Sequence, residues 1–176
     1  MTEAKAETKT QALQNSKGKD KEPKDKMPKD KMVAIEAPMP VIIALLGYGG
    51  ALPFVALAAA HWLSLQLPFA QPAALLVGYG VVILSFVGAL SWGSHLRDQH
   101  ISQGLYIWSI VPALMGWVAL MVPLMMAALI VIIGLIICWW GDRAKVKTGI
   151  WPRWMGRLRA HLTILACLSL SILLIA

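Results

Sequence analysis

Charge is scarce in most of this sequence. Charged residues make up 14% of its 176 residues and hydrophobic residues make up 58%, whereas about a quarter of a soluble domain is charged. Residues 41–176 contain only two acidic side chains, Asp98 and Asp142. Their uncharged runs are long enough to span the hydrocarbon core of a bilayer, which excludes a water-soluble globular protein.

Cysteine is equally scarce, and this excludes further classes of site. The thiols Cys138 and Cys167 both fall within apolar runs, so we predict inert buried thiols rather than a disulfide framework. His95, Asp98 and His100 match no strong metal-binding spacing, and no nucleophile is paired with a base at diagnostic spacing. We therefore predict no catalytic, cofactor-binding or metal-ligating residue, and no cofactor.

The positive charges are grouped, and their places indicate the kind of partner. The net charge is +7; residues 1–40 hold nine Lys and seven Asp or Glu, and residues 41–176 hold seven Lys or Arg. In the hydrophobic part these cations cluster between apolar runs, as the topology-setting charges of membrane proteins do. We therefore predict the lipid bilayer as a partner and exclude nucleic acid.

Residues 1–38 form a polar tail that is rich in Lys, Thr, Gln and Pro. Because this tail has no apolar periodicity, we expect it to be disordered. Its long charged region excludes a secretory signal peptide, and seven acids without any Arg are unlike a mitochondrial transit peptide. The pattern favours the bacterial inner membrane, with the tail in the cytoplasm.

Five apolar runs follow, and they predict an all-α fold, a five-helix transmembrane bundle over residues 39–176. The runs cover about residues 41–64, 72–94, 104–121, 123–140 and 158–176. Pro53 and Pro112 should bend the first and third spans. The Lys-rich tail, a polar loop over 95–103 and a basic loop over 141–157 fall on one side of this multi-pass arrangement. The positive-inside rule then places the N-terminus in the cytoplasm and the C-terminus in the periplasm.

The stretch from Gly78 to Asp98 begins within the second span and ends in the polar loop that follows it, and we expect the bundle to pack around this stretch. Ser85, Ala89 and Gly93 are four residues apart and share one helical face, so a neighbouring helix can approach closely there. The predicted helix-packing positions of the whole bundle are Gly47, Ala51, Ser85, Gly88, Ala89, Gly93 and Gly134.

Polar side chains gather at the predicted cytoplasmic ends of spans two, four and five. This candidate rim cluster contains Trp92, His95, Arg97, Asp98, Asp142, Arg143 and Arg159. Asp142 ends a face of small residues on span four, four residues after Cys138. An interfacial acid usually finds a basic partner, so we expect Asp142 to pair with Arg97, Arg157 or Arg159 from a neighbouring helix end.

Several short motifs occur between about residues 45 and 170. They are Tyr79-x-x-x-Ile83-Leu84-Ser85-Phe86-x-Gly88 with Trp92-Gly93, Gly50-Ala51-Leu52-Pro53-Phe54, Asp142-Arg143, and Trp151-Pro152-Arg153-Trp154 with Leu158-Arg159 and Leu162-Thr163. Together they resemble a small family of uncharacterised multi-pass membrane proteins, a domain of unknown function with bacterial inner-membrane and mitochondrial members. Ala89 departs from the Gly that the family often has there. The resemblance implies a five-helix integral membrane protein and brings no established activity.

Three functions are consistent with this pattern. We favour a non-enzymatic scaffold or assembly and accessory factor that binds other membrane proteins, because the spans carry no charge at mid-membrane depth. The first alternative is a small-molecule or ion carrier built around the proline-broken spans. The second alternative is a membrane enzyme that uses His95, Asp98 or Asp142 at the cytoplasmic rim.

Overall fold

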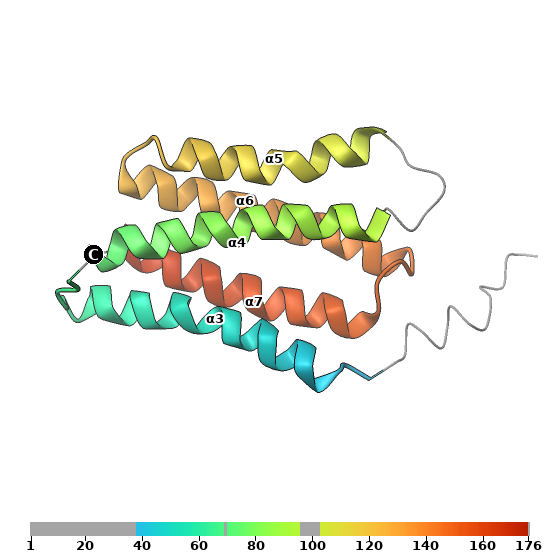
Figure 1. Ribbon diagram of the computed structural model, residues 1–176, viewed down its shortest axis with the longest axis horizontal. Helices are drawn as coiled ribbons and strands as arrows, with labels where there is room; N and C mark the ends of the chain where they lie inside the picture. The colour runs from blue at the N-terminus through green and yellow to red at the C-terminus, as the bar shows by residue number, and fades with distance from the viewer. Residues whose placement is uncertain (1–37, 69, 96–102, 176) are drawn as a thin grey trace, which may run out of the picture. The chain divides into compact units, whose positions relative to one another are not determined.

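The computed structural model describes residues 38–68, 70–95 and 103–175, with side chains for 38–68, 70–90 and 107–175. Over these residues the chain forms the helices α3 (Val41–Trp62), α4 (Pro72–His95), α5 (Gln103–Ala119), α6 (Leu124–Lys147) and α7 (Arg153–Ser171), followed by the 3-10 turn η1 (Ile172–Leu174) (Figure 1). The predicted all-α, five-helix bundle is confirmed. The predicted disordered tail lies, apart from Pro38, outside the described residues.

Four of these helices are long and apolar enough to cross a membrane: α3, α4, α6, and α7 together with η1. α5 has 17 residues, which rise about 26 Å against a hydrocarbon core of about 30 Å. A span of that length is accommodated by local thinning of the bilayer or by flanking residues that reach the interface. The protein is a multi-pass integral membrane protein.

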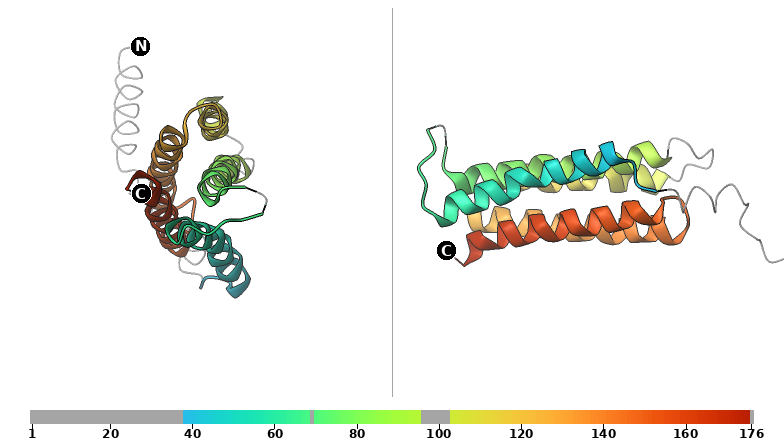
Figure 2. Two further views of the ribbon diagram at one scale, coloured as in Figure 1. Left: turned by 90° about the vertical axis from the view of Figure 1, so that its left-hand side faces the viewer. Right: turned by 90° about the horizontal axis from the view of Figure 1, so that it is seen from below.

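α4 lies at the centre of the arrangement and contacts every other helix of the described chain. α3 packs on α4 and α7, whereas α5 packs on α4 and α6, so α3 and α5 lie on opposite edges of the bundle (Figure 2). Leu76 and Leu84 of α4 are fully buried. The prediction that the bundle packs around the second span is confirmed.

The two ends of the bundle differ in charge. The α6–α7 connection lies at the same end as the start of α3, whereas the α5–α6 turn and the end of α7 lie at the opposite end (Figure 1). Every Lys and Arg among the described residues falls between Arg143 and Arg159, at the α6–α7 end. The described connections at the opposite end, 63–71 without residue 69 and 120–123, contain no charged residue.

The α6–α7 connection differs from the basic loop predicted over residues 141–157. α6 continues as a helix to Lys147 and α7 begins at Arg153, so only residues 148–152 connect them. Charge ends the apolar run after Trp140, but Ala, Lys and Arg are good helix formers and the backbone ladder continues through them. With 24 residues, α6 rises about 36 Å and extends beyond the hydrocarbon core.

Glycines lie at places where neighbouring helices pack closely. A Cβ on Gly88 of α4 would lie 2.7 Å from the backbone oxygen of Ser109 on α5, and a Cβ on Gly134 of α6 would lie 2.8 Å from a methyl of Leu84. Ala89, a predicted packing position, is instead exposed. Successive helical residues are rotated by about 100°, so the face that meets α5 includes Gly88 and turns Ala89 away.

The other predicted packing positions occupy varied environments. Ala51 is buried, and a Cβ on Gly47 would lie 3.2 Å from a leucine side chain of α7. Ser85 is half-buried and its Oγ donates to the carbonyl one turn earlier on its own helix, at 3.0 Å. The side-chain surroundings of position 93 lie outside the described residues.

Candidate functional site

A buried ion pair joins α6 to α7 at the charged end of the bundle. The Nε of Arg159 donates to Oδ2 of Asp142 at 2.9 Å, and Nη2 lies 2.8 Å from the same oxygen. Asp142 is 3% exposed and Arg159 is 8% exposed. Of the three partners that the sequence left open for Asp142, the structure pairs it with Arg159, while Arg97 lies outside the described residues.

A second cation reaches the other oxygen of the same carboxylate. The Nζ of Lys145, one helical turn after Asp142, lies 3.3 Å from Oδ1. The same ammonium group lies 4.6 Å from the centre of the Trp151 ring, and this indole is itself buried. We call Asp142, Lys145, Trp151 and Arg159 the clamp. Because buried charges are costly unless paired, the two cations compensate the carboxylate where it is shielded from water.

The turn after α6 brings Trp151 back over Lys145. Gly149 has a φ of 75°, a left-handed conformation that favours glycine. Its N–H donates to the Val146 carbonyl at 3.2 Å, and the N–H of Ile150 donates to the Lys145 carbonyl at 3.0 Å. This pair of hydrogen bonds is a Schellman motif, which ends the helix and reverses the chain. The turn therefore positions the Trp151 ring next to the ammonium group of Lys145.

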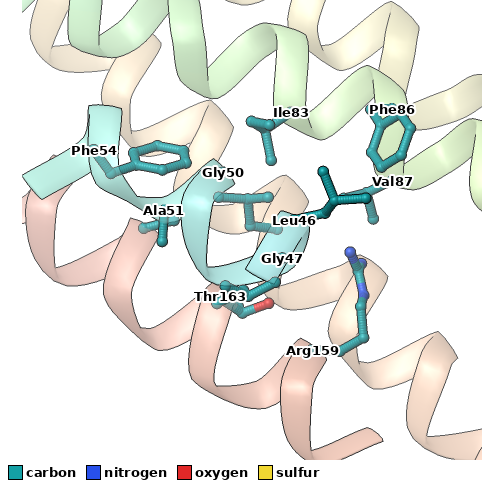
Figure 3. A pocket seen from close by; sticks show the side chains of 13 residues that line it. Leu46, Gly47, Gly50, Ala51, Phe54, Ile83, Phe86, Val87, Arg159 and Thr163 are labelled. Carbon is teal, nitrogen blue, oxygen red and sulfur yellow. The ribbon is translucent and has the colours of Figure 1, made fainter. Parts of the chain in front are cut away.

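An apolar cavity of about 180 Å³ lies between α3, α4, α6 and α7. Gly50 and Ala51 line the cavity and fill little of it, because their side chains are small or absent. α4 and α7, which also line it, make little direct contact with each other. Figure 3 shows Arg159 beside the cavity, pointing from α7 towards Val87 of α4. A cavity of about 150 Å³ can hold a molecule of the size of benzene, so this one can hold one small apolar group.

Two tyrosines tie α3 to its neighbours. The hydroxyl of Tyr79 on α4 donates to the carbonyl of Gly50 at 2.7 Å, three residues before Pro53. The ring of Tyr79 packs edge-on against Phe54, with 5.0 Å between the ring centres. On the other side, the Tyr48 hydroxyl lies 3.0 Å from Nδ1 of His161 on α7.

The structure brings together part of the predicted rim cluster. Asp142 and Arg159 are in contact, while Arg143 is exposed and its guanidinium lies 4.8 Å from the centre of the Trp139 ring. The remaining predicted members fall outside the described residues or side chains; these are Trp92, His95, Arg97 and Asp98.

Sequence reasoning missed two members of the clamp. Lys145 follows Asp142 by three residues, a helical spacing at which oppositely charged side chains meet; this signal was hidden because the segment was predicted to be a loop. The contact of Trp151 with Lys145 depends on the turn at Gly149, for which the hydrophobic pattern gives no signal.

Comparison with known proteins identifies the family of this chain. Residues 39–175 match the family described as "Protein of unknown function (DUF3429)". The chain is 36% identical over 146 residues to Transmembrane protein 69 of Xenopus tropicalis; the match covers 77% of this chain and 53% of that protein, so the chain spans about half the length of that relative. No solved structure matches the chain. It belongs to the DUF3429 family of proteins of unknown function.

Proposed function

We propose that this protein is a non-enzymatic scaffold or accessory factor that binds other membrane proteins in the bacterial inner membrane. The observation that carries this proposal is the clamp, in which both oxygens of Asp142 accept from cations, Arg159 on Oδ2 and Lys145 on Oδ1. A carboxylate that serves in proton transfer must reach a substrate or water, whereas this one is buried and paired. Its arrangement favours a structural role that holds α6 and α7 together.

The charge distribution supports an orientation with the N-terminus in the cytoplasm and the C-terminus in the periplasm. The described Lys and Arg residues lie at the α6–α7 end, which is also the end where α3 begins. Cytoplasmic ends of membrane proteins carry an excess of such residues.

α3 offers the surface for a partner protein. It lies on an edge of the bundle. Among the described helices, α4 and α7 are the ones with which it makes extensive contact. Most of its large side chains are exposed, including Val41, Ile42, Leu45 and Leu52. In a membrane such a face contacts lipid or another protein, and van der Waals packing drives the association of helices.

Affinity purification of the full chain from its native membrane in a mild detergent tests this function. We expect a membrane protein to co-purify in a constant ratio, and to be lost when Leu45→Ala and Leu52→Ala are combined on α3. The matched control combines Leu114→Ala on α5 with Leu168→Ala on α7, which are also exposed. A chain that purifies alone, together with a deletion strain of normal growth, would contradict the proposal.

A small-molecule carrier is the second candidate, and the cavity favours it. The cavity lies beside the part of α3 that contains Pro53 and is lined by Gly50 and by Arg159. Uptake of radiolabelled amino acids, sugars and nucleosides into proteoliposomes tests this function. Transport that is abolished by Gly50→Leu and retained in Gly49→Leu, where a Cβ meets nothing within 4 Å, would favour the carrier over the scaffold.

A further inference from the structure

A second hollow, of about 380 Å³, lies between α6 and α7 on the surface of the bundle. Arg143 and Lys147 of α6 line it together with Arg153 and Arg157 of α7, and Trp139 lines it towards the membrane. We call it the cationic groove. All four cationic side chains are exposed, and no acidic side chain of the described residues lines the groove.

The clamp explains why the groove keeps its positive charge. Asp142 is the one acidic residue within the described part of the chain, and its two carboxylate oxygens accept from Arg159 and Lys145. Because Asp142 is buried in those contacts, it does not neutralise the groove. The first turn of α7 adds to the positive potential, since it contains no acid and its start has no side-chain cap.

The groove lies at the depth of lipid headgroups. Residues 124–140 of α6 carry no charge, and the first cation after them, Arg143, stacks over Trp139 at 4.8 Å. Tryptophan side chains prefer the membrane interface, where one part of the ring is wet and the rest is apolar. The cations of the groove therefore begin where the hydrocarbon core ends.

We propose that the cationic groove binds the phosphate group of an anionic phospholipid. Arginine guanidinium groups bind phosphate oxygens in a bidentate manner, and the volume falls in the range of about 300–1,000 Å³ that small-molecule sites occupy. Ile136 lies one helical turn deeper in the membrane than Trp139, on the same face of α6. Ile164 likewise lies one turn deeper than Ala160 on α7, and both isoleucines are exposed. They offer an apolar surface for the acyl chains below the headgroup.

The test uses the full chain, purified in a neutral detergent and titrated with phosphatidylglycerol or phosphatidylcholine while native mass spectrometry counts bound lipid. We expect phosphatidylglycerol to bind at least about tenfold more tightly than phosphatidylcholine. Combining Arg143→Gln, Lys147→Gln and Arg157→Gln should weaken its binding roughly a hundredfold, because each cation near an anionic lipid contributes a similar increment. Should the triple variant not fold, Arg157→Gln alone should weaken binding about fivefold.

The matched control removes the same charge from the tail by Lys24→Gln, Lys26→Gln and Lys29→Gln, and it should change binding by less than about twofold. An equal loss in this control would assign the lipid to the tail and overturn the proposal. Displacement of the lipid by millimolar inorganic phosphate would indicate a site for soluble phosphate and would also overturn it. Lipid that binds only after Asp25→Asn, Asp30→Asn and Glu36→Gln would also overturn the proposal. That result would mean that the acidic tail occupies the groove in the unchanged chain.

Discussion

Gly156 of α7 faces Val146 of α6 so closely that a Cβ on the glycine would lie 2.9 Å from a Val146 methyl. Along both helices this contact lies between the Asp142–Arg159 pair and the Gly149 turn, and it limits how near the two helix backbones approach. The α6–α7 hairpin is therefore held at three places along its closed end: the Gly149 turn, the Gly156 contact and the Asp142–Arg159 pair.

Gly156→Ala should destabilise the protein by about 1–3 kcal/mol, because the added methyl overpacks the contact with Val146. The free energy of unfolding is measured by titration with a denaturing detergent in mixed micelles. Val146→Ala removes the methyl that the new Cβ meets, so the double variant should recover most of the loss. If the double variant is as unstable as the sum of the two single variants, the contact does not set the helix separation.

Asp142→Asn should lower the free energy of unfolding by about 3–5 kcal/mol, because it leaves Arg159 buried without its counter-charge. Arg143→Gln is the control, since Arg143 is the neighbouring residue on the same helix and is exposed. Substitution at such a surface position should change stability by less than about 0.5 kcal/mol. Equal effects of the two substitutions would show that the pair adds nothing to stability.

Gly88→Ala should destabilise the crossing of α4 and α5 by about 1–3 kcal/mol. The new Cβ would meet the backbone oxygen of Ser109 at 2.7 Å, and a backbone atom cannot move aside as a flexible side chain can. Gly78→Ala on the same helix is the control, because its Cβ meets nothing within 4 Å. Alanine favours helix over glycine by about 1 kcal/mol, so this control should be neutral or stabilising in the same unfolding titration.

Tyr79→Phe should lower the free energy of unfolding by about 1 kcal/mol, through loss of the hydrogen bond to the Gly50 carbonyl. Phenylalanine keeps the edge-on ring contact with Phe54, so the change isolates the hydroxyl. Tyr79→Ala removes ring and hydroxyl together and should cost about 3–5 kcal/mol. Hydrogen exchange of the backbone amides around Pro53 should rise in both variants; unchanged exchange would mean that Tyr79 does not restrain α3.

The sequence contained enough information for the helices but not for the clamp. Hydropathy located each span because the bilayer requires about twenty apolar residues per crossing, and grouped charges located the ends. Hydropathy also led to the prediction of a loop over residues 141–157, because the apolar run ends at the first charged residues. The helix itself continues through those residues to Lys147. Selecting Arg159 over Arg157 for Asp142 required the rotation of α7 about its axis, and that rotation depends on packing.

The closed end of the α6–α7 hairpin also bears on how the protein enters the bilayer. All Asp, Lys and Arg side chains of this hairpin lie near its bend, from Asp142 to Arg159, and the remainder of each arm carries none. Biosynthetic insertion of the hairpin therefore requires no translocation of a full charge through hydrocarbon, which would cost about 2.5–3.5 kcal/mol per residue on insertion scales. The hairpin can insert as one preassembled unit, with its ionic groups remaining on the side from which it came.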